Sequence, residues 1–295
     1  MFGHAATLFG RCGVDLFFVI SGLIITKTAQ GLTASEFMSK RVCRIMPMYY
    51  LAALPWIVIG LANGTFGWRQ TIATGLLWPA TDSMTPPSLP VGWTLCFEML
   101  FYVSFALVIW RRWTIWFVLG TFLLALLFGQ SPVASFVGNP IILEFLFGIA
   151  LAHAKPVPWA IWGIPVGIAV LILGAALDWP PFGGEKDFLS GVNGWFRVVT
   201  LGIPAALIVW GALQIDARRG ALTVLGDASY SIYLFHAPLV AAAVWGMARF
   251  NFVPADLIII LASGFAILIG WRIHELFEKP LLALFKRPLA MPVTS

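Results

Sequence analysis

The chain has 295 residues, of which 60% are hydrophobic and only 11% are charged. A soluble globular domain usually carries about 25% charged residues, so this chain has too few polar side chains to cover a water-exposed surface. The composition excludes soluble folds, and the long, continuous apolar stretches favour membrane-spanning helices over a β-barrel.

Net charge and cysteine content exclude further classes of function and of stabilising site. The formal charge is +5, but no basic run is longer than two residues, so nucleic-acid binding is not expected. Cys12, Cys43 and Cys96 form no CxxC pair and have no histidine at ligand spacing. We therefore expect neither a disulfide framework nor a metal site, and we interpret the cysteines as apolar packing residues.

Apolar stretches close to the spanning length of roughly 20 residues recur along the chain. They predict an all-α, polytopic membrane helical bundle with nine spans, near residues 14–30, 46–63, 92–110, 114–130, 139–153, 158–178, 196–214, 230–248 and 255–274. The segment 68–79 is apolar but short, and Arg69 and Gln70 interrupt it, so we interpret it as interfacial or re-entrant. Because the sequence shows no internal repeat and no low-complexity linker, it predicts a single integral membrane domain over residues 1–295.

The distribution of basic residues predicts the orientation of the chain. If the spans alternate in direction, twelve Lys and Arg residues fall on one side and five on the other, with Arg272 inside the last span. Basic residues concentrate on the cytoplasmic side of membrane proteins, which places loop 27–45 and the C-terminus in the cytoplasm. Met1 is then outside with no signal peptide, so we expect that the first helix of a ten-span fold is missing.

The first predicted span opens with GVDLFFVISG at residues 13–22. Asp15 lies near the outer end of this span, where the helix dipole stabilises an acid. Asp15 therefore has either a structural role, as a helix cap or anchor, or a functional role. Ser21 adds a hydroxyl to the same segment. We take Asp15 and Ser21 as candidate pocket residues.

Two arginines follow in the predicted cytoplasmic loop. Arg41 and Arg44 are three residues apart, and they share one face if the stretch is helical. Paired guanidinium groups can bind phosphates bidentately, which suits a nucleotide or coenzyme A. The alternative is that these arginines reflect only the cytoplasmic preference for positive charge.

Two carboxylates, Glu98 and Glu144, lie inside apolar spans. A carboxylate in the bilayer is costly, so each should face the bundle and have a partner. Tyr102 follows Glu98 by one turn on the same face, and Trp93 opens that segment. Either carboxylate can be a structural hydrogen-bond acceptor, but we expect a functional role for at least one.

The span after residue 229 carries polar groups at helical spacing. They are Ser229, Tyr233 and His236. His236 is either a satisfied interior histidine or part of a polar pocket. More polar groups end the last span, where interfacial charge is expected: His274, Glu275, Glu278 and Lys279.

Together these segments resemble the membrane acyltransferase-3 family, whose members O-acylate cell-surface carbohydrates and related molecules. The matching segments are GVDLFFVISGLIIT at 13–26, FMSKRVCRIMPMYY at 37–50, WTLCFEMLFYV at 93–103, LGDASYSIYLFHAPLV at 225–240 and FEKP at 277–280. They occur in the order of the family and cover nearly the whole chain. The segment NPIILEFLFG at 139–148 is similar to the branch that modifies exopolysaccharides.

The resemblance implies transfer of an acyl group, in particular acetyl, in the inner membrane of a bacterium. Cytoplasmic acyl-CoA would be the cosubstrate and a hydroxyl of a cell-surface or exported polysaccharide the acceptor. No tightly bound cofactor and no metal are implied, and the polysaccharide-synthesis machinery is an implied partner.

Several residues match family motifs. Arg41 and Arg44 match the RxxR motif implicated in donor binding, whereas Trp93, Glu98 and Tyr102 fall in a WSLxxExxFY-like segment. Thr94 stands where that segment often has Ser, and the hydroxyl is retained.

The usual candidate for the catalytic base in this family is a histidine near the outer end of the first span. Here the candidate is His4, nine residues before Gly13, which is either that histidine or an incidental loop residue. In the first case His4 takes the proton of the acceptor hydroxyl, a role that suits a neutral imidazole. Glu98 then orients the base or holds the sugar.

Two rival functions compete with acyl transfer. Intramembrane acids also mark the pathways of transporters and flippases, although such proteins often have repeated halves that are not detectable here. An inactive family member, acting as a scaffold or sensor, is the second rival.

Overall fold

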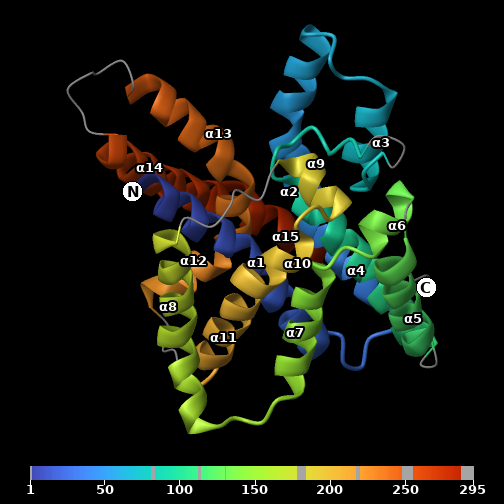
Figure 1. Cartoon of the computed structure of the whole chain (residues 1–295). Coiled ribbons are helices and arrows are strands. Elements are labelled where there is room, and N and C mark those ends of the chain that lie inside the picture. Colours follow the sequence, from blue (N-terminus) through green and yellow to red (C-terminus); the bar gives the residue numbers. More distant parts are fainter. Residues whose placement is uncertain are drawn as a thin grey trace, which may run out of the picture. The chain divides into compact units, whose positions relative to one another are not determined.

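The computed structural model describes residues 2–80, 84–111, 114–129, 131–177, 184–216, 220–247 and 255–286, without the side chains of residues 2–11 and of some residues in later helices. Within these ranges the regular structure is helical, apart from one isolated bridge between Ala80 and Thr85. The predicted all-α fold is confirmed (Figure 1).

Each predicted span overlaps one of the longer helices. These are α1 (Phe2–Thr28), α2 (Ala34–Ala62), α4 (Gly92–Trp110), α5 (Thr114–Phe128), α7 (Ile142–His153), α8 (Gly163–Ala176), α11 (Ile203–Ala212), α13 (Ser229–Met247) and α14 (Ala255–Ile273). The shorter helices are α3 (Trp68–Leu76), α6 (Pro132–Val137), α9 (Glu185–Ser190), α10 (Gly194–Arg197), α12 (Ala221–Asp227) and α15 (Lys279–Lys286). One 3₁₀ turn, η1 (Pro158–Trp162), and two π-helical turns, η2 (Val198–Gly202) and η3 (His274–Glu278), complete the set.

Within the described residues, five helical segments are long and apolar enough to cross a membrane. They are Ala34–Ala62, Gly92–Trp110, Pro132–His153, Gly194–Ala212 and Ile260–Phe285. Val118–Phe128 and Pro158–Gly174 are shorter apolar helices. These segments support a multi-pass membrane protein, whereas the count of nine spans stays a prediction.

Two helices start earlier than expected. α1 begins at Phe2 rather than near residue 14, so Asp15 lies inside the helix and its interpretation as an N-terminal cap is wrong. α2 begins at Ala34, where Thr33 and Glu36 form a capping box. Arg41 and Arg44 are therefore helical, and the expected loop at 27–45 shrinks to residues 29–33.

The segment expected to be short and non-spanning forms α3, which has only nine residues. The helix ends at Leu76, and the next residue, Leu77, has a left-handed backbone with φ of 49°. Side chains of α3 form hydrogen bonds with the following loop. The Gln70 amide donates to the carbonyl of Pro86 at 2.9 Å, and the Thr74 hydroxyl donates to the Ser88 hydroxyl at 3.1 Å.

The chain divides into two compact units. The first unit comprises Met1–Met38 and Ile59–Asp216, and the second comprises Ser39–Val58 and Ala217–Ser295. In the first unit α1 packs against α7, α8 and α11, and α8 packs against α11. In the second unit α13 and α14 form the main helix pair.

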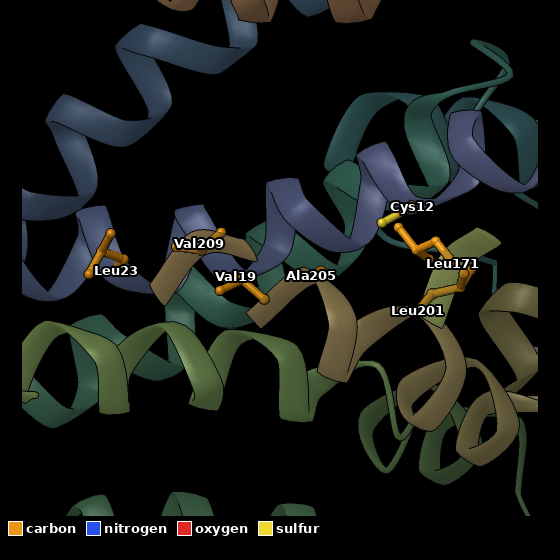
Figure 2. Close-up of a cluster of buried hydrophobic side chains, with 7 residues drawn as sticks. All are labelled: Cys12, Val19, Leu23, Leu171, Leu201, Ala205 and Val209. Atoms are coloured by element: carbon orange, nitrogen blue, oxygen red, sulfur yellow. The ribbon is translucent and has the colours of Figure 1, made fainter. Parts of the chain in front are cut away.

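Side chains from α1, α8, η2 and α11 form an apolar core of the first unit (Figure 2). The buried cluster consists of Cys12, Val19, Leu23, Leu171, Leu201, Ala205 and Val209. The members from α1 are seven and then four residues apart, and those from η2 and α11 are four apart, which is the spacing of one helix face. Cys12 is thus a packing residue, as predicted.

Two glycines let α1 and α7 approach closely. A Cβ atom added at Gly148 would lie 2.1 Å from the carbonyl oxygen of Val19, and one added at Gly22 would lie 2.2 Å from that of Phe145. Small residues serve this purpose in membrane helix pairs, where apolar transfer gives little driving force and close packing supplies the attraction.

The close contact makes Gly148 sensitive to substitution. We expect Gly148→Ala to destabilise the protein by about 1–3 kcal/mol, because the added methyl group has no room against the α1 backbone. Gly264→Ala in α14 is the control, since a Cβ there meets nothing within 4 Å. Thermal unfolding in detergent measures both, and equal stability of the two variants would contradict the packing argument.

Candidate functional site

A buried ion pair lies between α1 and the end of α10. Arg197 donates from Nε to Oδ1 of Asp15 at 2.9 Å and from Nη2 to Oδ2 at 2.8 Å, across 182 residues of sequence. Asp15 is 0% exposed and Arg197 is 3% exposed. This bidentate geometry is the strongest that a guanidinium and a carboxylate make.

Two aromatic rings cover Arg197. Its Cζ atom lies 4.9 Å from the ring centroid of Phe188 and 5.6 Å from that of Trp93. The two rings stack on each other with centroids 4.6 Å apart. Trp93 thus contributes to the ion pair through a cation–π contact, which gains strength where water is excluded.

Glu144 lies in the first turn of α7 and is fully buried. It interacts electrostatically with Asp15 and Arg197. A Cβ atom added at Gly202 would lie 2.8 Å from Oε1 of Glu144, so this glycine makes room for the carboxyl group. We call Asp15, Glu144 and Arg197 the carboxylate–arginine cluster.

A second polar cluster surrounds Glu98 on α4. Its Oε1 atom accepts hydrogen bonds from the Ser21 hydroxyl at 3.0 Å and from the Tyr102 hydroxyl at 2.5 Å. Glu98 and Tyr102 are 4% and 2% exposed. The expectation that Glu98 has a partner inside the protein is confirmed, and we call these three residues the Glu98 cluster.

The same helix anchors both clusters. Asp15 and Ser21 are six residues apart on α1, which corresponds to about 9 Å along the helix axis. The structure thereby brings five of the predicted residues together around α1 and α4: Asp15, Ser21, Trp93, Glu98 and Tyr102. Glu144 joins them from α7. His4 also belongs to α1, but its side chain lies outside the described part of the chain.

The remaining predicted residues belong to the second unit. Arg44 is exposed and Arg41 is half-buried, and both lie on α2. On α13, Nδ1 of His236 lies 2.6 Å from the carbonyl oxygen of Tyr233, a local contact within one turn. Tyr230 connects α13 to α2 by donating to the carbonyl of Ile45 at 2.8 Å.

Sequence reasoning missed a buried group in the second unit. Glu278 Oε2 accepts a hydrogen bond from the Ser231 hydroxyl at 2.6 Å and lies 2.8 Å from Nδ1 of His274. His274 is 7% exposed and Glu278 is 1% exposed, so their interpretation as interfacial charge is wrong. Glu275 and Lys279, which form an exposed ion pair at 2.9 Å, match that interpretation.

Sequence reasoning also missed Arg197 as a candidate site residue. Its signal in the sequence is weak: one arginine at the start of the apolar stretch VVTLGIP at 198–204. No spacing rule connects it to an acid 182 residues earlier. Within the described residues, no group of three or more His, Cys, Asp or Glu side chains lies close enough to hold a metal ion.

The buried pair makes a testable prediction. Asp15→Asn and Arg197→Met should each destabilise the protein by about 3–5 kcal/mol, since each leaves a buried charge without its partner. The double variant should lose less stability than the sum of the losses in the two single variants. A double-mutant cycle on thermal unfolding measures the coupling, and additive losses would show that the pair does not act as a unit.

The comparisons with known proteins identify the family. A family described as an acyltransferase domain matches residues 1–276. Over 303 aligned residues the chain is 35% identical to the exopolysaccharide production protein ExoZ of Rhizobium meliloti (strain 1021), covering 95% of this chain and 92% of that protein. It is 27% identical over 278 residues to nodulation protein 10 of Rhizobium leguminosarum bv. viciae, covering 78% of this chain and 71% of that protein.

No solved structure matches the chain. The family match nevertheless covers nearly the whole sequence, and the two relatives align over most of their own lengths. The chain therefore belongs to the acyltransferase-3 family and is an acyltransferase that transfers groups other than aminoacyl groups.

Proposed function

We propose that the chain is an O-acyltransferase that moves an acyl group, in particular acetyl, from cytoplasmic acyl-CoA to a hydroxyl of an exported or cell-surface polysaccharide. One observation carries the proposal: the similarity to an exopolysaccharide production protein covers 95% of this chain and 92% of the relative. A polysaccharide offers many hydroxyl groups, and acyl transfer onto one of them forms an ester.

The proposed reaction needs one proton transfer. The acceptor oxygen bonds to the thioester carbonyl carbon, the carbon–sulfur bond breaks, and the hydroxyl proton ends on the thiol of coenzyme A. His4 is the proposed base, because a neutral imidazole both takes and returns a proton near neutral pH. Its helix, α1, also carries Asp15 and Ser21.

Glu98 is the proposed group that orients the base or holds the acceptor. Its Oε1 atom accepts from the hydroxyls of Ser21 and Tyr102, which are the same kind of donor as a sugar hydroxyl. Such a buried acceptor binds more strongly than it would in water, because the surrounding dielectric is low. Trp93, Asp15 and Glu144 complete this polar region of the first unit.

Arg41 and Arg44 are the proposed grip on the donor phosphates. They are three residues apart in α2, so they lie on one side of the helix. Arg44 is exposed and Arg41 is half-buried, so they leave at least one guanidinium accessible to a ligand. The distribution of basic residues supports an orientation with these arginines on the cytoplasmic side of an inner membrane. Acyl-CoA is made in the cytoplasm, so the donor would approach from that side.

The first test of the function is direct transfer. Inverted membrane vesicles that contain the full chain and enclose exopolysaccharide should move label from added labelled acetyl-CoA into that polysaccharide as an alkali-labile ester. Vesicles without the chain are the control. Label that stays on the donor while polysaccharide crosses the membrane would contradict the proposal and favour the transporter alternative.

The donor site makes a separate prediction. Arg41→Lys and Arg44→Lys should each raise the KM for the donor roughly tenfold, about 1.4 kcal/mol, because lysine keeps the charge but loses the bidentate fork. The kcat should change little. Arg111→Lys is the matched control, since Arg111 is an exposed arginine that packs on the Trp110 ring with Cζ 5.0 Å from its centroid. A KM that rises equally in all three variants would rule out a specific phosphate site.

A further inference from the structure

The carboxylate–arginine cluster holds two acids and one guanidinium. Asp15 uses both of its carboxyl oxygens to accept hydrogen bonds from Nε and Nη2 of Arg197. Glu144 adds a second carboxyl group that is 0% exposed. Neither of its oxygens has a hydrogen-bond partner among the residues that the structure describes. An ionised Glu144 would thus be a buried charge without a donor, the costliest arrangement for a carboxylate.

Helix packing directs Glu144 toward Asp15. Gly22 follows Asp15 by seven residues and Gly148 follows Glu144 by four, so each acid shares a helix face with the glycine that makes the α1–α7 contact. Asp15 and Glu144 therefore interact electrostatically across the α1–α7 contact. Two neighbouring ionised carboxylates repel and have no hydrogen to share, whereas one proton lets them form a hydrogen bond.

The surroundings offer little else to balance a charge on Glu144. The titratable groups that act on it are Asp15 and Arg197, and Glu144 in turn acts on Cys12, a neutral thiol in the apolar stripe of α1. On the side of η2 the neighbour is Gly202, which brings no side chain. With one proton on the acid pair, the cluster carries one positive and one negative charge and is neutral overall.

We propose that Glu144 is protonated in the folded protein and donates a hydrogen bond to Asp15, so that Glu144 is the positioning residue for the Asp15–Arg197 pair. The donated hydrogen bond fixes the Asp15 carboxyl group from the α7 side while Arg197 holds it from the α10 side. This assignment concerns the resting protein and does not rest on the proposed function.

Infrared spectroscopy of the purified full chain in detergent tests the assignment. A protonated carboxyl group has a C=O stretching band separate from those of carboxylates and amides, and this band shifts in heavy water. The unmutated chain should show the band, and Glu144→Gln, which retains a hydrogen-bond donor of similar size, should lose it. Glu275→Gln is the matched control, because Glu275 forms an exposed ion pair with Lys279 and should not contribute to the band. An unmutated chain without the band, or a band that persists in Glu144→Gln, would overturn the proposal.

A second measurement needs no substitution, so it can still overturn the proposal if Glu144→Gln fails to fold. The full chain is produced once with isotope-labelled glutamate and once with isotope-labelled aspartate. The protonated-carboxyl band should shift with labelled glutamate. A band that shifts only with labelled aspartate would place the proton on an aspartate and overturn the assignment to Glu144.

Discussion

The buried pair of Asp15 and Arg197 is the constraint on which the arrangement of the first unit depends. Both ions are removed from water, and their mutual attraction offsets the cost of desolvation only if the geometry is bidentate and other groups support it. The two hydrogen bonds of 2.8 and 2.9 Å meet this requirement. They fix the register of α1 against α10. The π-helical turn η2 begins at the residue after Arg197, and α11 continues from η2.

The packing of α1 explains how one helix serves two polar clusters and an apolar core. Its stripe of Cys12, Val19 and Leu23 faces α8 and α11, while Gly22 accepts the close approach of α7. Asp15, on the same face as Gly22, meets Arg197, and Ser21, on another face, meets Glu98. For an acyltransferase this placement is useful, because polar groups held by rigid helices keep their orientation in a surrounding of low dielectric.

Each unit has a π-helical turn at a buried polar group. In the first unit η2 follows Arg197 directly and contains Gly202, beside Glu144. In the second unit η3 spans His274–Glu278, the two residues that meet at Glu278 Oε2. A π-helical turn shifts the helix register, so it can direct a side chain to a face that a regular helix would not reach, and such turns are frequent at functional sites.

The sequence by itself determined the membrane class, the helical fold, the approximate position of each long helix and the acyltransferase resemblance, because hydropathy and motif order are local properties of the chain. It also indicated that Glu98 needs an internal partner, since a carboxylate in an apolar span is costly. Only the tertiary structure decided that Arg197 is the partner of Asp15, that Glu144 joins them, and that His274 and Glu278 are buried rather than interfacial. These contacts join residues on different helices, and hydrophobic periodicity contains no information about which faces meet.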